Sequence, residues 1–142
     1  MFVASLLNLD AVGQAIPAGT DVTVVCSGTD GRFALEDAYA AGRVVELLAG
    51  ARSDAAQAAA RLAAAYVDPR VPLSESADGA VVQAWGQGGD IPFCAGESVL
   101  AVVTRVTAAS AGVAVVCDPE HIDRSTPMYL AQRLVDHLPT AR

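Results

Sequence analysis

The stretch VTVVCSGTDGRFALEDAYAAGRVVELL, Val22 to Leu48, joins two kinds of apolar pattern through a glycine-rich loop. Its first part, Val22–Cys26, is a short β-branched apolar run, which is typical of a strand covered on both faces. Its last part, Ala34–Leu48, repeats apolar residues at helical spacing, and Gly50 follows as a stop signal. The stretch therefore predicts a strand, a loop and a helix in succession.

The same alternation continues outward from this stretch. Further apolar runs typical of strands lie at Phe2–Leu7, Val99–Val106 and Gly112–Cys117, and further helical patterns lie at Asp54–Val67 and Thr126–Leu138. Alternating strands and helices predict an α/β fold, a layered α/β/α arrangement around a mostly parallel or mixed sheet. We expect a single domain over residues 1–142, in which Asp68–Pro72 is an internal loop.

Composition excludes several function classes. The chain has 142 residues and a formal net charge of −7, and all nine of its cations are arginine. Without lysine there is no Schiff-base or phosphate-loop lysine, and the acidic balance argues against nucleic acid and anionic membranes as partners. No apolar run approaches the ~20 residues of a membrane span. The three scattered cysteines predict reduced thiols in a cytoplasmic protein.

The loop between strand and helix has the residue types of an anion site. Gly28 and Gly31 permit positive φ and close approach of a ligand, and the loop leads into a helix N-terminus, whose free amides favour an anion. Arg32 adds a fork-shaped cation for phosphate or sulfonate oxygens. Glu36 and Asp37, in the first helical turn, have the chemistry to hold Mg²⁺ beside such an anion. A plain turn followed by acidic partners of the helix dipole remains the alternative.

These residues carry a family resemblance. CSGTDGRFALEDAYAAG, residues 26–42, resembles a segment of the 2-phosphosulfolactate phosphatases that reads roughly C-A-G-t-x-G-r-f-s-l-E-D-x-x-x-A-G. Upstream, FVASLLNLDAVGQAI is similar to a family strand ending in asparagine, and downstream GGDIPFCAGESVLAVVTRV is similar to the family's closing segment. Together the resemblance covers about residues 2–106. The matching positions are Asn8, Gly28, Gly31, Glu36, Asp37, Gly42 and Asp90.

The resemblance implies a Mg²⁺-dependent phosphatase that converts 2-phosphosulfolactate to sulfolactate on the route to coenzyme M. The expected partner is then a small anionic phosphorylated substrate. The expected anion-binding residues are Asn8, Gly28, Thr29, Gly31 and Arg32, and the expected metal ligands are Glu36, Asp37 and Asp90.

Family members also carry N-terminal motifs (an Asp-x-x-Arg-Ala-Ser-Thr-like stretch, a Gly-Glu-Arg stretch and a Thr-Thr-Asn-Gly-Thr stretch) that do not occur here. The chain thus resembles the later part of such a protein. We expect a homo-oligomer or a companion chain that supplies the missing part. A degenerate, non-catalytic homologue or an oligomerising anion-binding module is the alternative function.

Cys26 and Arg32 also have the Cys-x5-Arg spacing of cysteine-dependent phosphatases. Val25 replaces the usual preceding histidine, Phe33 replaces the usual hydroxyl residue, and Asp30 adds a negative charge within the loop. We therefore interpret Cys26 as a buried cysteine that closes an apolar strand.

Two other groups of residues have weaker signals. The run CDPEHID, Cys117–Asp123, gathers possible metal ligands, but its spacing matches no zinc pattern and suits an ordinary turn. His121 and His137 are the two histidines, and neither lies in a nucleophile motif. Trp85 is interpreted as an anchor that pins a loop to the core, with the mouth of a pocket beside Asp90 as the alternative.

Overall fold

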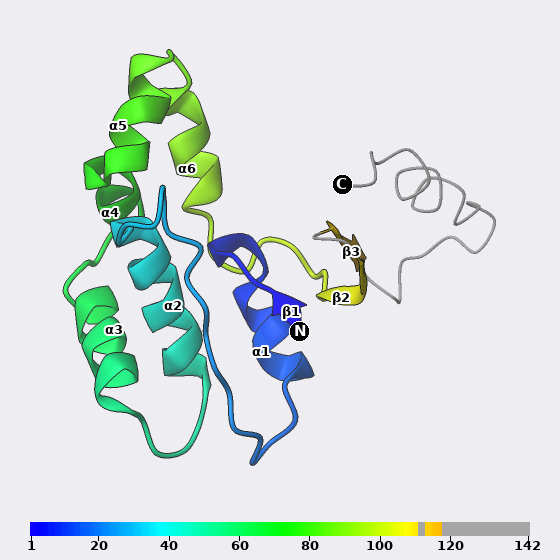
Figure 1. Ribbon diagram of the computed structural model, residues 1–142. Coiled ribbons are helices and arrows are strands. Elements are labelled where there is room, and N and C mark those ends of the chain that lie inside the picture. Colours follow the sequence, from blue (N-terminus) through cyan, green and yellow to red (C-terminus); the bar gives the residue numbers. More distant parts are fainter. Residues whose placement is uncertain (111–112, 118–142) are drawn as a thin grey trace. The chain divides into compact units, whose positions relative to one another are not determined.

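The computed structural model describes residues 1–110 and 113–117. They form two compact units, Ala4–Ala101 and, separately, Met1–Val3 with the chain from Val102 (Figure 1). The single-domain organisation of residues 1–142 stays a prediction. The predicted helix Thr126–Leu138 lies outside the described residues.

The larger unit is helical. In chain order its elements are η1 (Leu6–Asn8), α1 (Leu9–Ala15), α2 (Leu35–Leu47), α3 (Asp54–Ala64), α4 (Arg70–Glu75), α5 (Ala77–Ala84), η2 (Gly88–Asp90) and α6 (Ile91–Cys94). In the part of the chain that the structure describes, no helix has the length and apolar character needed to cross a bilayer.

Helices α2 and α3 pack closely and form the centre of this unit. Gly42 of α2 makes the approach possible, because a Cβ at this position would lie 2.2 Å from the carbonyl oxygen of Ala59 in α3. Tyr39 is 2% exposed and makes an edge-to-face contact with Tyr66, with ring centroids 6.0 Å apart. The predicted helix Ala34–Leu48 is confirmed as α2. The predicted second helix is confirmed as α3, although it ends at Ala64.

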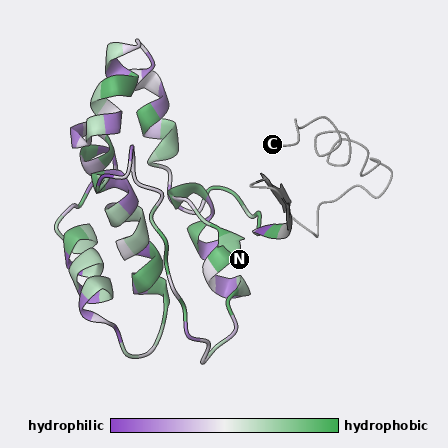
Figure 2. Ribbon diagram, in the orientation of Figure 1, coloured by the Kyte–Doolittle hydropathy of each residue, from purple (hydrophilic) through white to green (hydrophobic). Residues whose placement is uncertain are grey.

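Two local predictions for this unit are wrong. The run Val22–Cys26 is not a strand, because it pairs with no other described segment, and residues 21–27 are all exposed. In Figure 2 the hydrophobic colour nevertheless continues along this segment. The run Asp68–Pro72 is not simply a loop, since α4 begins at Arg70. Pro72 is tolerated there because the first turn of a helix needs no amide donor.

The smaller unit is a sheet of order β1-β2-β3, built from β1 (Phe2–Val3), β2 (Thr104–Ser110) and β3 (Val113–Cys117). Both pairings are antiparallel, with Phe2 opposite Arg105 and Val106 opposite Val116. The Arg105 guanidinium carbon lies 4.9 Å from the centre of the Phe2 ring. The strand predicted at residues 112–117 is confirmed as β3. The strand predicted at residues 2–7 is limited to Phe2–Val3, and the one predicted at residues 99–106 is displaced, because β2 begins at Thr104 and continues to Ser110.

The combination of helices and strands confirms a mixed α/β protein. The prediction of a mostly parallel or mixed sheet is wrong for the described strands, all of which pair antiparallel. Only two residues separate β2 from β3, and a parallel connection needs a crossover of a dozen or more. The α/β/α layering stays a prediction.

Candidate functional site

Residues Thr29 to Arg32 form a tight reverse turn at the position of the predicted anion loop. The Thr29 amide donates to the Arg32 carbonyl at 3.2 Å, and the Arg32 amide donates back to the Thr29 carbonyl at 2.9 Å. The two central residues, Asp30 and Gly31, have φ angles of 53° and 72°. Positive φ at both central positions is typical of a type I′ turn, for which Asp-Gly is a preferred sequence. The loop is therefore closed by its own backbone.

Two carboxylates fasten this turn to the surrounding helices. The Gly28 amide donates to Asp37 Oδ2 at 2.6 Å, which ties the turn to the first turn of α2. The Thr29 hydroxyl donates to the carboxylate of Asp78 in α5. Sequence reasoning missed Asp78, because it is 49 residues away and looks like an ordinary first-turn acid. The result is a turn held at a set position beside the N-terminus of α2.

The expectation of free amides around the loop is wrong in part. The amides of Gly28, Thr29 and Arg32 all donate within the protein. The Arg32 side chain is exposed, and its guanidinium makes no hydrogen bond or ion pair with any described residue. The Arg32 guanidinium is therefore still available to an oxyanion, and it can bind phosphate or sulfonate as a fork of donors.

Glu36 and Asp37 differ in what their carboxylates contact. Glu36 Oε2 is buried and has no hydrogen-bond partner, the one such side-chain atom found among the described residues. Asp37 instead accepts the Gly28 amide. A buried, unpaired carboxylate oxygen is costly unless a donor or cation completes it. Glu36 is therefore the predicted ligand whose environment best suits a cation.

The predicted metal ligands do not form one cluster. Asp90 is exposed in η2, and nowhere in residues 1–110 and 113–117 do three Asp, Glu, His or Cys side chains gather as a metal-binding group. Metal binding by Glu36, Asp37 and Asp90 stays a prediction, since the described residues do not show these three carboxylates gathered in one group. Because Mg²⁺ needs only one or two carboxylates together with phosphate and water, Glu36 fits part of a site.

Asn8 has a structural role in the larger unit. It is 5% exposed, and its Oδ1 accepts the Ser5 amide at 2.8 Å and the Ser5 hydroxyl at 3.3 Å. The two residues form a reciprocal capping box around η1. Anion binding by Asn8 stays a prediction, with its side-chain oxygen already engaged.

Cys26 and Trp85 both differ from their expected burial. The Cys26 side chain is exposed, so its interpretation as a core cysteine is wrong. Partial burial of the sulfur and the charge of nearby Asp37 raise the pKa of Cys26, which favours the unreactive thiol. Trp85 is 74% exposed, so the anchor interpretation is wrong as well. The remaining run, residues 118–123, lies outside the described residues.

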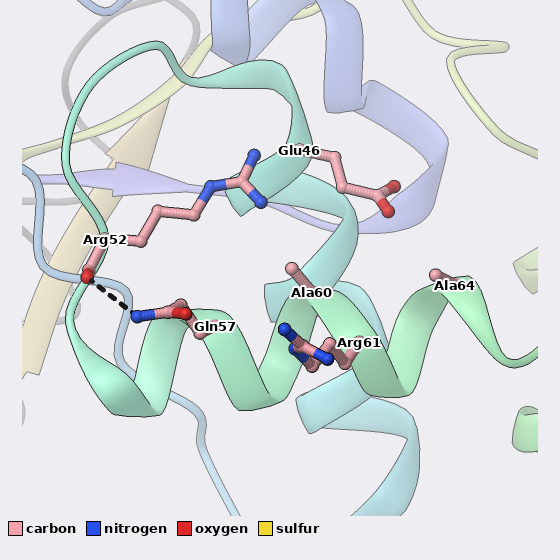
Figure 3. A pocket seen from close by; sticks show the side chains of 6 residues that line it. All are labelled: Glu46, Arg52, Gln57, Ala60, Arg61 and Ala64. Atoms are coloured by element: carbon pink, nitrogen blue, oxygen red, sulfur yellow. Dashed lines mark hydrogen bonds between the residues drawn. The ribbon is translucent and has the colours of Figure 1, made fainter.

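A separate groove of about 510 Å³ lies along α2, the following loop and α3. Figure 3 shows its lining side chains, which are Glu46, Arg52, Gln57, Ala60, Arg61 and Ala64. Arg52 donates to the Val45 carbonyl at 3.3 Å, while Arg61 has no polar partner in the described part of the chain. None of the predicted site residues lines this groove.

The match to known proteins covers all of the larger unit and extends into the smaller one. Residues 1–109 match the family model of the 2-phosphosulpholactate phosphatases. The chain belongs to this family. The match includes the turn, Glu36 and Asp37, and it confirms the resemblance inferred from residues 26–42.

Curated relatives have the same family name. The chain is 38% identical over 112 residues to a probable 2-phosphosulfolactate phosphatase of Gloeobacter violaceus, covering 77% of this chain and 48% of the relative. It is 34% identical over 105 residues to the probable enzyme of Thermotoga maritima, covering 72% and 46%. It is 35% identical over 101 residues to the probable 2-phosphosulfolactate phosphatase of Thermus thermophilus, covering 67% of this chain and 43% of the relative. The chain thus spans about half the length of these relatives.

Proposed function

We propose that this chain contributes to the hydrolysis of a phosphate monoester of a small anionic acid, in the manner of a 2-phosphosulfolactate phosphatase. The observation that carries the proposal is the family match over residues 1–109, which includes the turn and the first turn of α2. Because the chain spans about half the length of its relatives, we propose activity in combination with a companion chain or a second copy.

Two side chains of the site would serve this chemistry. The exposed guanidinium of Arg32 would hold oxygens of the phosphate or sulfonate group. Glu36, with its unpaired Oε2, would hold Mg²⁺, and the bound ion would supply neutralisation of charge on phosphate. The role of Asp37 is to hold the Gly28 amide, and so to position the turn that carries Arg32.

A non-catalytic anion-binding homologue is the second candidate. One observation favours it: three loop amides already donate within the protein. Such a protein would keep the family scaffold and bind the phosphorylated acid without turnover.

Phosphate release from 2-phosphosulfolactate separates the two functions. We expect turnover that depends on Mg²⁺ and stops with EDTA, and that falls at least tenfold in Arg32→Ala and Glu36→Gln. The matched controls are Arg61→Ala, an exposed arginine of the separate groove, and Glu75→Gln, an exposed acid of α4. Both controls should retain the parent rate.

The assay has two contradicting outcomes. Binding of substrate without turnover, alone or with a companion polypeptide, would favour the non-catalytic homologue. Inhibition by iodoacetamide with indifference to EDTA would instead assign the chemistry to Cys26.

A further inference from the structure

The turn that carries Arg32 is bound at the N-terminal end of α5 as well as at α2. The Thr29 hydroxyl donates to Oδ2 of Asp78 in α5, and the Gly28 amide donates to Asp37 Oδ2 in α2 at 2.6 Å. The loop that precedes α2 reaches this end of α5 (Figure 1). All of these residues belong to the larger unit, so these contacts do not depend on how the two units are placed.

Thr29 closes the turn in addition to fastening it. Its amide and its carbonyl make both backbone hydrogen bonds to Arg32, so the two residues face each other across the turn. Fixing Thr29 therefore fixes the backbone from which the Arg32 guanidinium extends. An arginine on a loose loop loses backbone freedom when it binds an anion, whereas an arginine on a fixed turn loses only the freedom of its side chain.

Asp78 lies on a tightly packed corner between α4 and α5. The Ser76 side chain joins the two helices, because its hydroxyl donates to the Leu73 carbonyl at 2.9 Å and accepts the Gly79 amide at 2.9 Å. Ser76 is 2% exposed. A Cβ at Gly79 would lie 1.9 Å from the Leu73 carbonyl oxygen, so the start of α5 lies directly against the end of α4. The carboxylate that holds Thr29 is thus attached to a buried, hydrogen-bonded corner.

The charge of Asp78 limits what its contact with Thr29 can do. A carboxylate only accepts, so the Thr29 hydroxyl gives its one proton to Asp78 and has none to donate to an oxyanion. A negative charge beside an anion also opposes binding of that anion by Coulomb repulsion. In an oxyanion site, this contact can therefore help binding only by placing the turn.

We propose that Asp78, acting through the Thr29 hydroxyl, is a positioning residue for Arg32. The corner between α4 and α5 then forms part of the oxyanion site, although none of its residues touches the anion. Thr29 is the link between Asp78 and Arg32 and is not itself an anion ligand. This inference rests on the proposed function in one respect, which is that Arg32 binds a phosphate or sulfonate group.

Titration of the full chain with inorganic phosphate tests the proposal, followed by NMR at Arg32 Nε and at the backbone amides. We expect Asp78→Ala to weaken phosphate binding about fivefold, because ordering of the turn then opposes binding. Loss of a negative charge alone would strengthen binding, so the sign of the change separates positioning from electrostatics. The matched control is Asp54→Ala, which removes an exposed acid from the first turn of α3 and should leave the phosphate Kd unchanged.

Substitutions of Thr29 supply the second measurement. Thr29→Val removes the hydroxyl but keeps the β-branched shape, and it should weaken phosphate binding as Asp78→Ala does. Thr29→Ser keeps the hydroxyl and should bind phosphate like the parent chain. Combining Thr29→Val with Asp78→Ala should add little, because both remove the same contact. Hydrogen exchange of the Arg32 amide, which donates to Thr29, should be faster in both weakened variants and normal in Thr29→Ser.

Two outcomes would overturn the positioning role and leave the proposed function standing. Stronger phosphate binding in Asp78→Ala would show that repulsion dominates or that the freed Thr29 hydroxyl binds the anion itself. Unchanged affinity in Asp78→Ala would show that Asp78 does not serve Arg32, even where the turn has loosened. In both cases Arg32→Ala would still weaken phosphate binding. If Arg32→Ala has no effect, or the parent chain shows no saturable binding, the proposed role of Arg32 is wrong and its positioning by Asp78 is wrong with it.

Discussion

Helix α2 and the segment Asp21–Ser27 lie on the two sides of the same turn, and both are rich in apolar residues. Helix α2 buries six residues, among them Tyr39, Val44 and Val45, against its neighbours. The segment buries none of its seven. Similar apolar content thus leads to opposite environments on either side of one turn.

The difference follows from where each element finds its partners. A helix satisfies its interior amides and carbonyls within one stretch of chain and needs cover along only one stripe. A strand finds every backbone partner in another segment, and a strand with two apolar faces needs cover on both. Apolar sequence therefore shows how much burial a segment requires, while its neighbours decide whether that requirement is met.

The largest expected effect is on the packing of α2 against α3, the buried side of this comparison. Gly42→Ala places a Cβ 2.2 Å from the Ala59 carbonyl oxygen and 2.7 Å from the Ala63 Cβ, so α2 and α3 must separate. We expect a loss of about 3 kcal/mol in the free energy of unfolding, measured by urea denaturation. Gly13→Ala is the control, because its Cβ would meet the flexible Leu47 side chain at 3.1 Å. Equal stability of the two variants would contradict the close packing.

A smaller effect concerns the ion pair that ties α2 to the chain after α6. Arg43 donates to both carboxylate oxygens of Glu97 at 2.8 Å, and the Tyr39 hydroxyl lies 3.3 Å from the same carboxylate. Both charged side chains are partly exposed, so solvent screens the pair. We expect Glu97→Gln to lower the unfolding free energy by about 1 kcal/mol.

The control for this ion pair is Asp68→Asn. Its partner, Arg70, is much more exposed than Arg43. Glu97→Gln should melt at a lower temperature than Asp68→Asn, whose melting temperature should lie close to that of the unsubstituted chain. A greater loss of unfolding free energy in Asp68→Asn than in Glu97→Gln would contradict a stabilising role for the Arg43–Glu97 ion pair.

The predictable parts of the fold are those whose causes are local. Helical spacing located α2 and α3, and Ser53 is the N-cap that its position indicates, accepting the Ala56 amide at 3.3 Å. The strand prediction at Val22–Cys26 failed because β-branched composition does not say where a pairing segment comes from. The antiparallel pairing of β2 and β3 was readable from the short interval between the predicted strands at residues 99–106 and 112–117, because a parallel connection needs a dozen or more residues.

The site was predictable to a similar extent. Positive φ at Gly28 and Gly31 is confirmed, and glycine adopts that backbone without strain. The Asp-Gly dipeptide at Asp30 was itself a signal for a type I′ turn and for internal use of the amides. The contact from Thr29 to Asp78 joins residues 49 positions apart, and no local pattern predicts such a pair.

The reactivity of the Cys26 thiol reports on the electrostatic effect of Asp37, in α2, on the exposed segment Asp21–Ser27. Partial burial and the charge of Asp37 raise its pKa, so less thiolate is present at pH 8 than in a free thiol. We expect iodoacetamide to modify Cys26 several-fold more slowly than it modifies N-acetylcysteine, as measured by peptide mass spectrometry. Asp37→Asn keeps an acceptor for the Gly28 amide but removes the charge, which lowers the pKa and speeds the reaction. An unchanged rate in Asp37→Asn would show that Asp37 does not act on the thiol.

The smallest expected effect is in the exposed segment Asp21–Ser27. Because Val25 is 81% exposed, Val25→Thr should change the unfolding free energy by less than about 0.5 kcal/mol in dilute, monomeric protein. Val44→Ala is the reference substitution in α2. Because Val44 is only 8% exposed, this substitution should lower the free energy of unfolding by about 2 kcal/mol. Urea denaturation at several protein concentrations separates the monomer's stability from any contribution of pairing. If Val25→Thr costs as much as Val44→Ala in dilute protein, the segment is covered within the monomer. The contrast between the two sides of the turn would then reflect different packing partners and not the absence of one.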